Sequence, residues 1–492
     1  MNKATKRSEN LLLEVVSTSL QYIGIKLSTP HPFAIERGKT YVVAGENGAG
    51  KTTLGNIIEK GWNIGLNVIH GDKKSLKIRS IEFTDIHSLT GCADSYYQQR
   101  FESTASDGIP TVGDLIAGKI SDDRWTDLCR RLSIHDIRHK RINYLSSGEL
   151  RKFLIINLLT DIPDILIVDN PYIGLDTASR ALLNDLLRNV AAQGTAVMLL
   201  LCNTTDIPPF TDFVLPMKRL EVKKMLDVAA IGLPEVVSEV EALFESRGDA
   251  SAIPSPQLDE PVDYRYAFEL RHCDVCYGST VILHDVSWRV GAGERWALLG
   301  ENGSGKSTLL SLVYADNPQG YCNDISIFDC RRGCGESIWD IKRRIGYISP
   351  EMHLYFNGGE DTITVVASGL HDCVGCFSRV SDDMRLRAQQ WLDALGIGHL
   401  ACRMFRTLSS GEQRMALLAR TFIKNAPLLI LDEPLHGLDM MQKRLVAAVV
   451  ERLLESNGRS IIYVTHYEQE IPRLIDNIFR LERPAASLNP DE

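Results

Sequence analysis

The sequence predicts an α/β protein in which one domain, built around a largely parallel sheet, occurs twice in tandem. Three observations support this prediction. A glycine-rich loop at 45–53 recurs at 300–308, which is 255 residues later. A Leu-Ser-Ser-Gly-Glu segment at 145–149 recurs at 408–412, which is 263 residues later. Each half also contains an apolar run that ends in aspartate, and such a run is typical of a strand buried on both faces.

Length and composition are those of a multidomain globular protein. The 492 residues are too many for one hydrophobic core, and 44% hydrophobic against 24% charged residues is an ordinary balance. The formal charge of -9 disfavours a large non-specific nucleic-acid interface. No segment is apolar for long enough to cross a bilayer, and the N-terminus lacks a signal-peptide core. We therefore expect a cytoplasmic protein, either free or peripheral at the inner face of the cell membrane.

The domain boundaries follow from the repeat and from one turn-rich stretch. We expect domain 1 at 1–245, a linker at 246–261 and domain 2 at 262–492. The linker stretch contains one glycine and three prolines, which favour turns over regular structure. Apolar residues at helical spacing between Val236 and Phe244 predict a helix that packs against domain 1.

The repeated glycine-rich loops predict two sites for nucleotide phosphates. Each loop follows a predicted strand, at 41–44 or 296–299, and opens a predicted helix. In that context a Gly-x-x-x-x-Gly-Lys-[Ser/Thr] pattern surrounds an anion with backbone N–H groups and a helix N-terminus, and its lysine neutralises phosphate oxygens. We name the site of Lys51 site 1 and that of Lys306 site 2. The candidate ATP-binding residues of the two loops are Gly45, Glu46, Asn47, Gly48, Ala49, Gly50, Lys51, Thr52 and Thr53, and Gly300, Glu301, Asn302, Gly303, Ser304, Gly305, Lys306, Ser307 and Thr308.

An acid at the end of each buried strand indicates a Mg²⁺ site beside each phosphate loop. Asp169 and Asp432 end the two apolar runs, and an acid so placed organises Mg²⁺ and its waters. The hydroxyls of Thr52 and Ser307, which follow the loop lysines, are placed to bind the same ion. The sequence therefore predicts ATP and Mg²⁺ as ligands of both halves.

Together these motifs resemble those of the ABC ATPases, which hydrolyse ATP to ADP and phosphate. Each half has a Walker A loop, a Leu-Ser-Ser-Gly-Glu signature, a Walker B strand and a Gly-Leu-Asp D-loop, the last at 174–176 and 437–439. The resemblance covers nearly the whole chain. It implies two tandem P-loop domains, each with a mixed sheet, flanking helices and a helical subdomain.

The resemblance also implies how the two halves cooperate. In the ABC ATPases two domains pair head to tail over two ATP molecules, and each signature completes the site of the other domain. Carried over to this chain, Ser146 and Gly148 complete site 2, while Ser409 and Gly411 complete site 1.

An aromatic ring stacks on adenine in this family. Tyr22 and Tyr277 each lie 23 residues before the first glycine of a phosphate loop, so the two positions match. A tyrosine on a strand often serves only in packing, and both interpretations stay open at this stage.

The residues implied in catalysis differ between the halves. Glu433 follows the Walker B acid, where the family keeps the general base that polarises the attacking water, and His466 matches the switch histidine that contacts the γ-phosphate. The first half has Asn170, whose amide has no basic oxygen, and its corresponding strand ends in Cys202-Asn203 without a histidine. We therefore predict that site 2 hydrolyses ATP and that site 1 mainly binds it.

The glutamine loop, which in this family couples the metal site to a partner, is irregular. The segment 345–350 resembles the usual run into a glutamine, but no glutamine follows, and Ser349 and Glu351 are the alternatives. In the first half the candidates are Gln98 and Gln99.

A narrower resemblance lies in three segments of the second half, at 318–324, 331–333 and 335–342. They are similar to the ModF group, bacterial double-domain ATPases with molybdenum-transport or photorepair labels. This resemblance implies an ATPase subunit that energises a membrane transporter, with molybdate or metal-related import and an integral-membrane permease as partner.

Two alternatives come from other classes of ABC protein. One is a soluble translation factor that acts on the ribosome, against which stand the short acidic linker, the net negative charge and the absence of a glutamate at Asn170. The other is a DNA-repair or chromosome-associated ATPase, which usually carries inserted coiled coils or zinc modules that this sequence lacks.

The chain has 11 cysteines, which we expect to be reduced in the cytosol. Two pairs, Cys273/Cys276 and Cys373/Cys376, have the spacing of zinc ligands and could supply four thiolates. Because Cys276 lies on a predicted apolar strand, packing as a small hydrophobe is the favoured interpretation.

Overall fold

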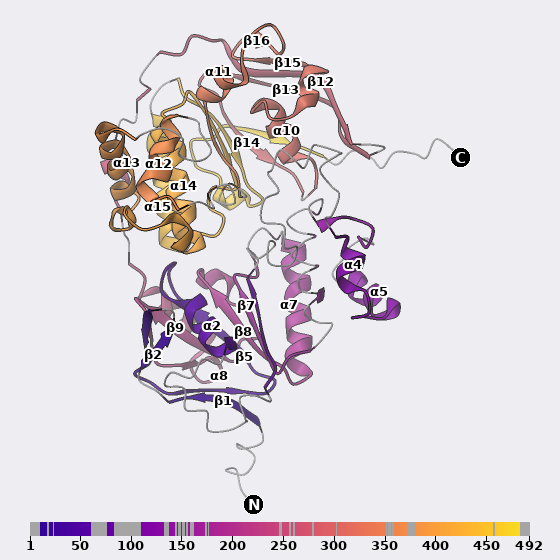
Figure 1. The fold of residues 1–492 in the computed structure, drawn as a ribbon, viewed down its shortest axis with the longest axis vertical. Helices are drawn as coiled ribbons and strands as arrows, with labels where there is room; N and C mark the ends of the chain where they lie inside the picture. Colours follow the sequence, from indigo (N-terminus) through magenta and orange to yellow (C-terminus); the bar gives the residue numbers. More distant parts are fainter. Residues whose placement is uncertain are drawn as a thin grey trace, which may run out of the picture. The chain divides into compact units, whose positions relative to one another are not determined.

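The chain divides into two compact units, Met1–Glu245 (unit 1) and Ser246–Glu492 (unit 2). Figure 1 shows their elements. The computed structural model describes residues 10–16, 19–22, 24–60, 76–82, 110–131, 137–142, 145, 149, 153, 156–157, 162–172, 175, 177–245, 248–254, 257–258, 261–277, 280–301, 303–350, 352, 356, 359–371, 380–455 and 458–482.

Unit 1 is built around one large sheet whose parallel part runs in the order β6-β7-β8-β5-β9. These strands are β6 (Ile78–Glu82), β7 (Ile165–Asp169), β8 (Ala196–Leu201), β5 (Thr40–Ala44) and β9 (Phe213–Lys218). Short strands continue it at one side, namely β10 (Glu221–Val222), β3 (Ile25–Ser28), β2 (Ser19–Tyr22) and β11 (Leu226–Asp227), while β1 (Leu11–Val15) and β4 (Phe33–Glu36) form a separate pair. The helices are α2 (Lys51–Lys60), α4 (Val112–Ile116), α5 (Asp122–Arg131), α7 (Thr177–Ala192), α8 (Val228–Ile231) and α9 (Leu233–Glu241).

Unit 2 has a five-stranded parallel sheet in the order β17-β18-β19-β14-β20. Its strands are β17 (Ile345–Ile348), β18 (Leu428–Asp432), β19 (Ser460–Val464), β14 (Arg295–Leu299) and β20 (Asn477–Arg480). A separate antiparallel sheet consists of β13 (Thr280–Gly291), β12 (Tyr266–Tyr277), β15 (Asp324–Ile327) and β16 (Cys330–Arg331). The helices are α10 (Lys306–Val313), α11 (Ile338–Arg343), α12 (Thr362–Ala367), α13 (Asp382–Ala394), α14 (Ser410–Ile423) and α15 (Met440–Glu455).

The two parallel sheets share one topology, which confirms the predicted tandem α/β fold. In each unit the strand before the glycine-rich loop pairs with a strand that separates it from the acid-ending strand. All three strands are parallel, so their carboxyl ends meet at one edge of the sheet. That edge is where open α/β sheets place ligands.

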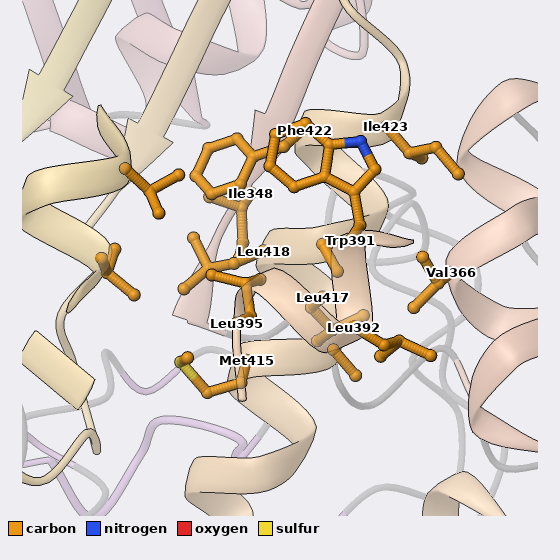
Figure 2. Packing of buried hydrophobic residues seen from close by; sticks show 14 of the residues in the cluster. Ile348, Val366, Trp391, Leu392, Leu395, Met415, Leu417, Leu418, Phe422 and Ile423 are labelled. Carbon is orange, nitrogen blue, oxygen red and sulfur yellow. The ribbon is translucent and has the colours of Figure 1, made fainter. Parts of the chain in front are cut away.

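The helical subdomain of unit 2 surrounds α14 with apolar side chains. Figure 2 shows Trp391 of α13 near Leu418 and Phe422 of α14, together with Ile348 of β17. Every residue of α14 from Arg414 to Ile423 is buried, because the helix contacts both its subdomain and the parallel sheet. Each fully buried side chain of this size contributes about 1.5–3 kcal/mol, so α14 is held in place along its length.

The stretch expected to act as a linker, 246–261, contributes to the core of unit 2. The Asp249 N–H donates to the Ala394 carbonyl at 2.9 Å, and Ile253 is buried in the core cluster around α13 and α14. Its glycine and prolines predict irregular backbone, and an irregular segment can still bury one apolar side chain. In unit 1, Val236 and Val240 of α9 are fully buried, as the helical spacing predicts.

Candidate nucleotide-binding sites

The two phosphate loops have the same backbone geometry, and each requires glycine just before its lysine. Gly50 has φ +99° and Gly305 has φ +96°, in the left-handed region that other residues rarely adopt. A Cβ at Gly50 would lie 2.8 Å from a Leu220 methyl, and one at Gly305 would lie 2.8 Å from a Leu283 methyl. Each loop is therefore pressed against neighbouring leucine side chains at the point where α2 or α10 begins.

The lysines of both loops are buried and lie across their own loop. Lys51 Nζ donates to the carbonyl oxygens of Gly45 and Glu46 at 2.7 and 2.8 Å. Lys306 repeats this arrangement with the first two residues of its loop, at 2.7 and 2.9 Å. Each loop thus holds a cation at the N-terminus of a helix, where an anion is stabilised by both the charge and the helix dipole.

The other candidate residues of the two loops differ in how far they are exposed. Ala49 and Ser304 are buried beneath their loops, whereas Gly48 and Gly303 are exposed at the tips. Glu46 is buried and accepts the N–H of Glu245. The remaining candidates are half-buried or exposed in the loop or the first helical turn, namely Asn47, Thr53, Glu301, Ser307 and Thr308. Asn302 lies outside the described residues.

In site 1 the two predicted Mg²⁺ ligands touch. Thr52 Oγ1 donates to Asp169 Oδ2 at 2.5 Å, and Asn170 Nδ2 donates to Asp169 Oδ1 at 2.9 Å. Burial raises the pKa of Asp169, while the Thr52 hydrogen bond and the Lys51 charge act in the opposite direction. The hydroxyl and carboxylate oxygens fit a hard cation such as Mg²⁺, which prefers oxygen ligands.

In site 2 the corresponding acid lies beside a second carboxylate. Asp432 is 6% exposed, and burial followed by the charge of Glu433 raises its pKa to about 7. The positive charges of Arg414 and Lys306 oppose this rise. A divalent cation is the species that would best compensate a buried carboxylate with a second, half-buried carboxylate beside it, so these residues also fit Mg²⁺.

Glu433 is held by a histidine and stands on an unusual backbone. His466 Nε2 lies 2.6 Å from Glu433 Oε1, and His436 Nε2 lies 3.9 Å from Glu433 Oε2. The backbone at Glu433 has φ +47°, which is uncommon for a residue with a side chain. Sequence reasoning missed His436, although its place directly before the D-loop glycine was a signal.

The register of the strands shows which residues of site 1 correspond to Glu433 and His466. Asn170 has φ +46° and its N–H donates to Leu200 O at 2.9 Å, as the Glu433 N–H does to Val464 O at 3.0 Å. Leu200 therefore corresponds to Val464, and two residues further along Cys202 corresponds to His466. The Cys202 side chain is buried. Site 1 thus has an amide and a thiol where site 2 has a carboxylate and an imidazole.

The signature of unit 2 forms the start of α14. Ser409 is the N-cap, and both its N–H and its hydroxyl donate to Glu412 Oε2 at 2.8 Å, so the motif is a capping box. Gly411 is buried in the first turn. Ser146 and Gly148 of the other signature lie outside the described residues.

Arg414, which sequence reasoning missed, joins the signature helix to the end of β18. Its guanidinium donates to the carbonyl oxygens of Asp432, Glu433 and Ser349 at 2.8, 2.6 and 2.5 Å. Burial lowers the pKa of Arg414 to about 10. The signal was a charged residue directly before the apolar run at 415–419 of the same helix.

The segment at 318–324, which carries part of the ModF resemblance, forms side-chain hydrogen bonds to the backbone of β12. The Gln319 side chain bonds both the N–H and the carbonyl of Cys276, at 3.2 and 2.8 Å. Asn323 does the same to Asp274, at 2.8 and 2.9 Å. Just before the segment, Asn317 Nδ2 donates to the hydroxyl of half-buried Tyr277 at 3.0 Å. Tyr22 ends β2, and its side chain lies outside what the structure describes.

Several features expected or considered from the sequence lie outside the described residues, namely Gln98, Gln99, Gly174, Asp176, Glu351, Cys373 and Cys376. Cys273 is buried in the core while Cys276 is exposed, so the packing role belongs to Cys273. Across the described ranges no group of three or more His, Cys, Asp or Glu side chains could hold a metal ion. Within the same ranges, no helix combines the length and hydrophobicity that crossing a membrane requires.

Comparison with known proteins places these features in context. A family model described as ABC transporter matches residues 29–173 and 283–436. The chain is 34% identical over 464 residues to the ABC transporter ATP-binding protein ModF of Escherichia coli (strain K12), covering 91% of this chain and 92% of that protein. It is 24% identical to an uncharacterized ABC transporter ATP-binding protein of Schizosaccharomyces pombe, covering 90% and 92%.

One solved structure, a model of ribosome-bound archaeal Pelota and ABCE1, matches with a TM-score of 0.60 over 95% of this chain and 77% of that chain. The sequence identity is 18%, and a likeness at that level shows a shared fold alone.

Proposed function

Because this chain belongs to the ABC transporter family of ATP-binding proteins, we propose that it binds ATP at two sites and hydrolyses it mainly at site 2. The observation that carries this proposal is the difference at one shared backbone position. Glu433 and Asn170 both follow the Walker B acid with φ near +47°, yet only the glutamate is a base.

At site 2 the loop residues and Lys306 bind the phosphates, while Ser307 and Asp432 would hold Mg²⁺. That ion would supply positive charge to the transferring phosphoryl group. Glu433 orients and polarises a water that attacks the γ-phosphorus. The bond to the β-phosphate oxygen breaks, which yields ADP and phosphate, and the carboxylate takes up the proton. His466, 2.6 Å from Glu433, fixes the direction of that carboxylate and contacts the γ-phosphate.

At site 1 the same fold binds ATP with slow turnover. The Asn170 amide donates to Asp169 at 2.9 Å, so it stabilises the ionised carboxylate and leaves no base for water. We further propose that Ser409 and Gly411 complete site 1 and that Ser146 and Gly148 complete site 2 when the domains pair head to tail. Tyr22 and Tyr277 stack on adenine in this proposal.

Turnover of two matched variants tests the division between the sites. Glu433→Gln removes the base and is expected to lower kcat by about 100-fold or more, since a general base contributes about 10²–10⁴. Asn170→Ala changes the equivalent residue and is expected to stay within about 2-fold, because no base is lost. Both variants should still bind ATP. Similar losses in the two variants would refute the proposed division.

We propose that the ATP energises a membrane transporter through an integral-membrane permease. The support is the 34% identity to a protein named an ABC transporter ATP-binding protein, and molybdate enters the proposal through the ModF resemblance alone. The partner can be tested with Glu433→Gln protein purified from cells with ATP and Mg²⁺. Stoichiometric recovery of a small integral-membrane protein supports transport. Recovery of ribosomal particles would replace it with the translation-factor alternative.

A further inference from the structure

We infer that Arg414 is a positioning residue for hydrolysis, which holds the backbone of Glu433 in the conformation that aims its carboxylate at the attacking water. The inference rests on the proposed role of Glu433 as the base. Arg414 lies on α14, the helix that begins at the signature, and it acts through the backbone at 432–433.

The conformation that has to be maintained is that of the Glu433 backbone. Glu433 has φ +47°, a region where glycine and asparagine are tolerated and glutamate is rare. Asn170 occupies the same conformation in unit 1, where its residue type suits it. A glutamate there persists only if its surroundings determine the backbone on both sides.

Hydrogen bonds on both sides of Glu433 hold that backbone. The Glu433 N–H donates to Val464 O at 3.0 Å, which fixes one side of the residue. Arg414 fixes the other side, because Nη2 donates to the carbonyls of Asp432 and Glu433 at 2.8 and 2.6 Å. A longer contact from Nε reaches Pro434 O at 3.4 Å. A planar guanidinium with five donors can bridge adjacent carbonyls in this way, whereas an ammonium cannot hold the same geometry.

The hydrogen bonds of Arg414 end on two separate segments of backbone. The side chain is 5% exposed, and within the described part of the chain its hydrogen bonds all end on backbone carbonyls. Nη1 reaches Ser349 O at 2.5 Å, directly after β17. One guanidinium therefore connects the residue of the base to the irregular glutamine-loop segment, and both to the helix that begins at the signature.

The helix that carries Arg414 is packed along most of its length. Arg414 lies between the capped first turn of α14 and its fully buried remainder, whose Met415 and Leu418 are in the apolar cluster of Figure 2. A helix packed on all sides cannot shift locally to follow a relaxed loop. The backbone of Glu433 is therefore hydrogen-bonded to a side chain of a helix that is held in place.

The test uses Arg414→Met and Arg414→Lys, with Arg420→Met as the matched control. Arg420 is a buried arginine on the same helix, but its Nε donates to Ser368 Oγ at 3.0 Å, away from Glu433. Both Arg414 variants are expected to lower kcat by about 10- to 100-fold with KM for ATP within about 2-fold, because a small misplacement of a catalytic group has that effect. Arg420→Met is expected to lower the thermal midpoint while kcat per folded molecule is unchanged.

A double-mutant cycle separates positioning from general structural damage. In a Glu433→Gln background, Arg414→Lys is expected to cause no further loss of turnover, since the group it positions is already gone. Equal loss in both backgrounds, or equal loss from the Arg414 and Arg420 variants, would overturn the inference. Should Arg414→Met not fold, Arg414→Lys retains the charge and decides the result.

The outcome also separates this inference from the proposed function. If Glu433→Gln lowers turnover and the Arg414 variants do not, only the inference is refuted. Turnover that does not depend on Glu433 would refute the proposed base and the inference together.

Discussion

Replacing Asp432 with asparagine should stabilise unit 2 at neutral and alkaline pH when nucleotide and Mg²⁺ are left out. Burial and the neighbouring Glu433 carboxylate raise the pKa of Asp432 from 3.8 to about 7. The folded unit therefore holds this proton more tightly than the unfolded chain does. The stability that results is complete below about pH 4, and it is lost as the pH rises through about 7.

The size of the effect follows from the same two pKa values. One pKa unit corresponds to 1.36 kcal/mol, so at about pH 8 the ionised carboxylate lowers the free energy of unfolding by about 4 kcal/mol. Asparagine keeps the shape and cannot ionise. The gain of Asp432→Asn over wild type should thus be near zero at about pH 4 and grow to about 4 kcal/mol at about pH 8.

Urea unfolding followed by tryptophan fluorescence measures this difference, because four of the six tryptophans belong to unit 2. Asp382→Asn, which changes an exposed acid in the first turn of α13, controls for net charge. A gain that does not change with pH would refute the reasoning. So would an Asp432→Asn protein that is less stable than wild type at about pH 8.

The remaining predictions concern the loop, the core and the conversion of site 1. Gly305→Ala should weaken ATP binding at site 2 by about tenfold in an equilibrium titration, since φ +96° costs about 1–2 kcal/mol for alanine; unchanged affinity would contradict the loop geometry. Leu418→Ala should lower the free energy of unfolding of unit 2 by about 2–5 kcal/mol in urea. A change below about 1 kcal/mol would show that the surrounding side chains close the cavity that alanine leaves. Asn170→Glu combined with Cys202→His should raise the phosphate release of a Glu433→Gln protein several-fold, because the strand register places both groups as in site 2; no increase would show that a further group is missing.

Much of the fold and part of the sites could be predicted from sequence because the signals are local. The apolar runs around 165–169 and 429–432 must be buried strands, whatever they pack against, and the structure confirms both. The loops at Gly50 and Gly305 need a left-handed glycine and a following helix, which a short pattern encodes. The tandem repeat predicted one topology used twice, and the two parallel sheets share it.

Other features depend on residues that are distant in the chain, and only tertiary structure decided them. Whether Cys202 or Asn203 corresponds to His466 depends on strand pairing, since a shift of one residue changes the answer. That Ile253 is buried depends on a surface supplied by α13 and α14.

What the sequence by itself determined is the repeated P-loop fold and a glutamate after the strand-ending aspartate in one half only. Both are encoded within a few consecutive residues, where backbone conformation and residue type are enough to predict them. The tertiary structure decided the elevated pKa of Asp432 and the bracing of Glu433 by Arg414. Electrostatic and hydrogen-bond energies depend on distance and burial, and these arise only when separate segments pack together.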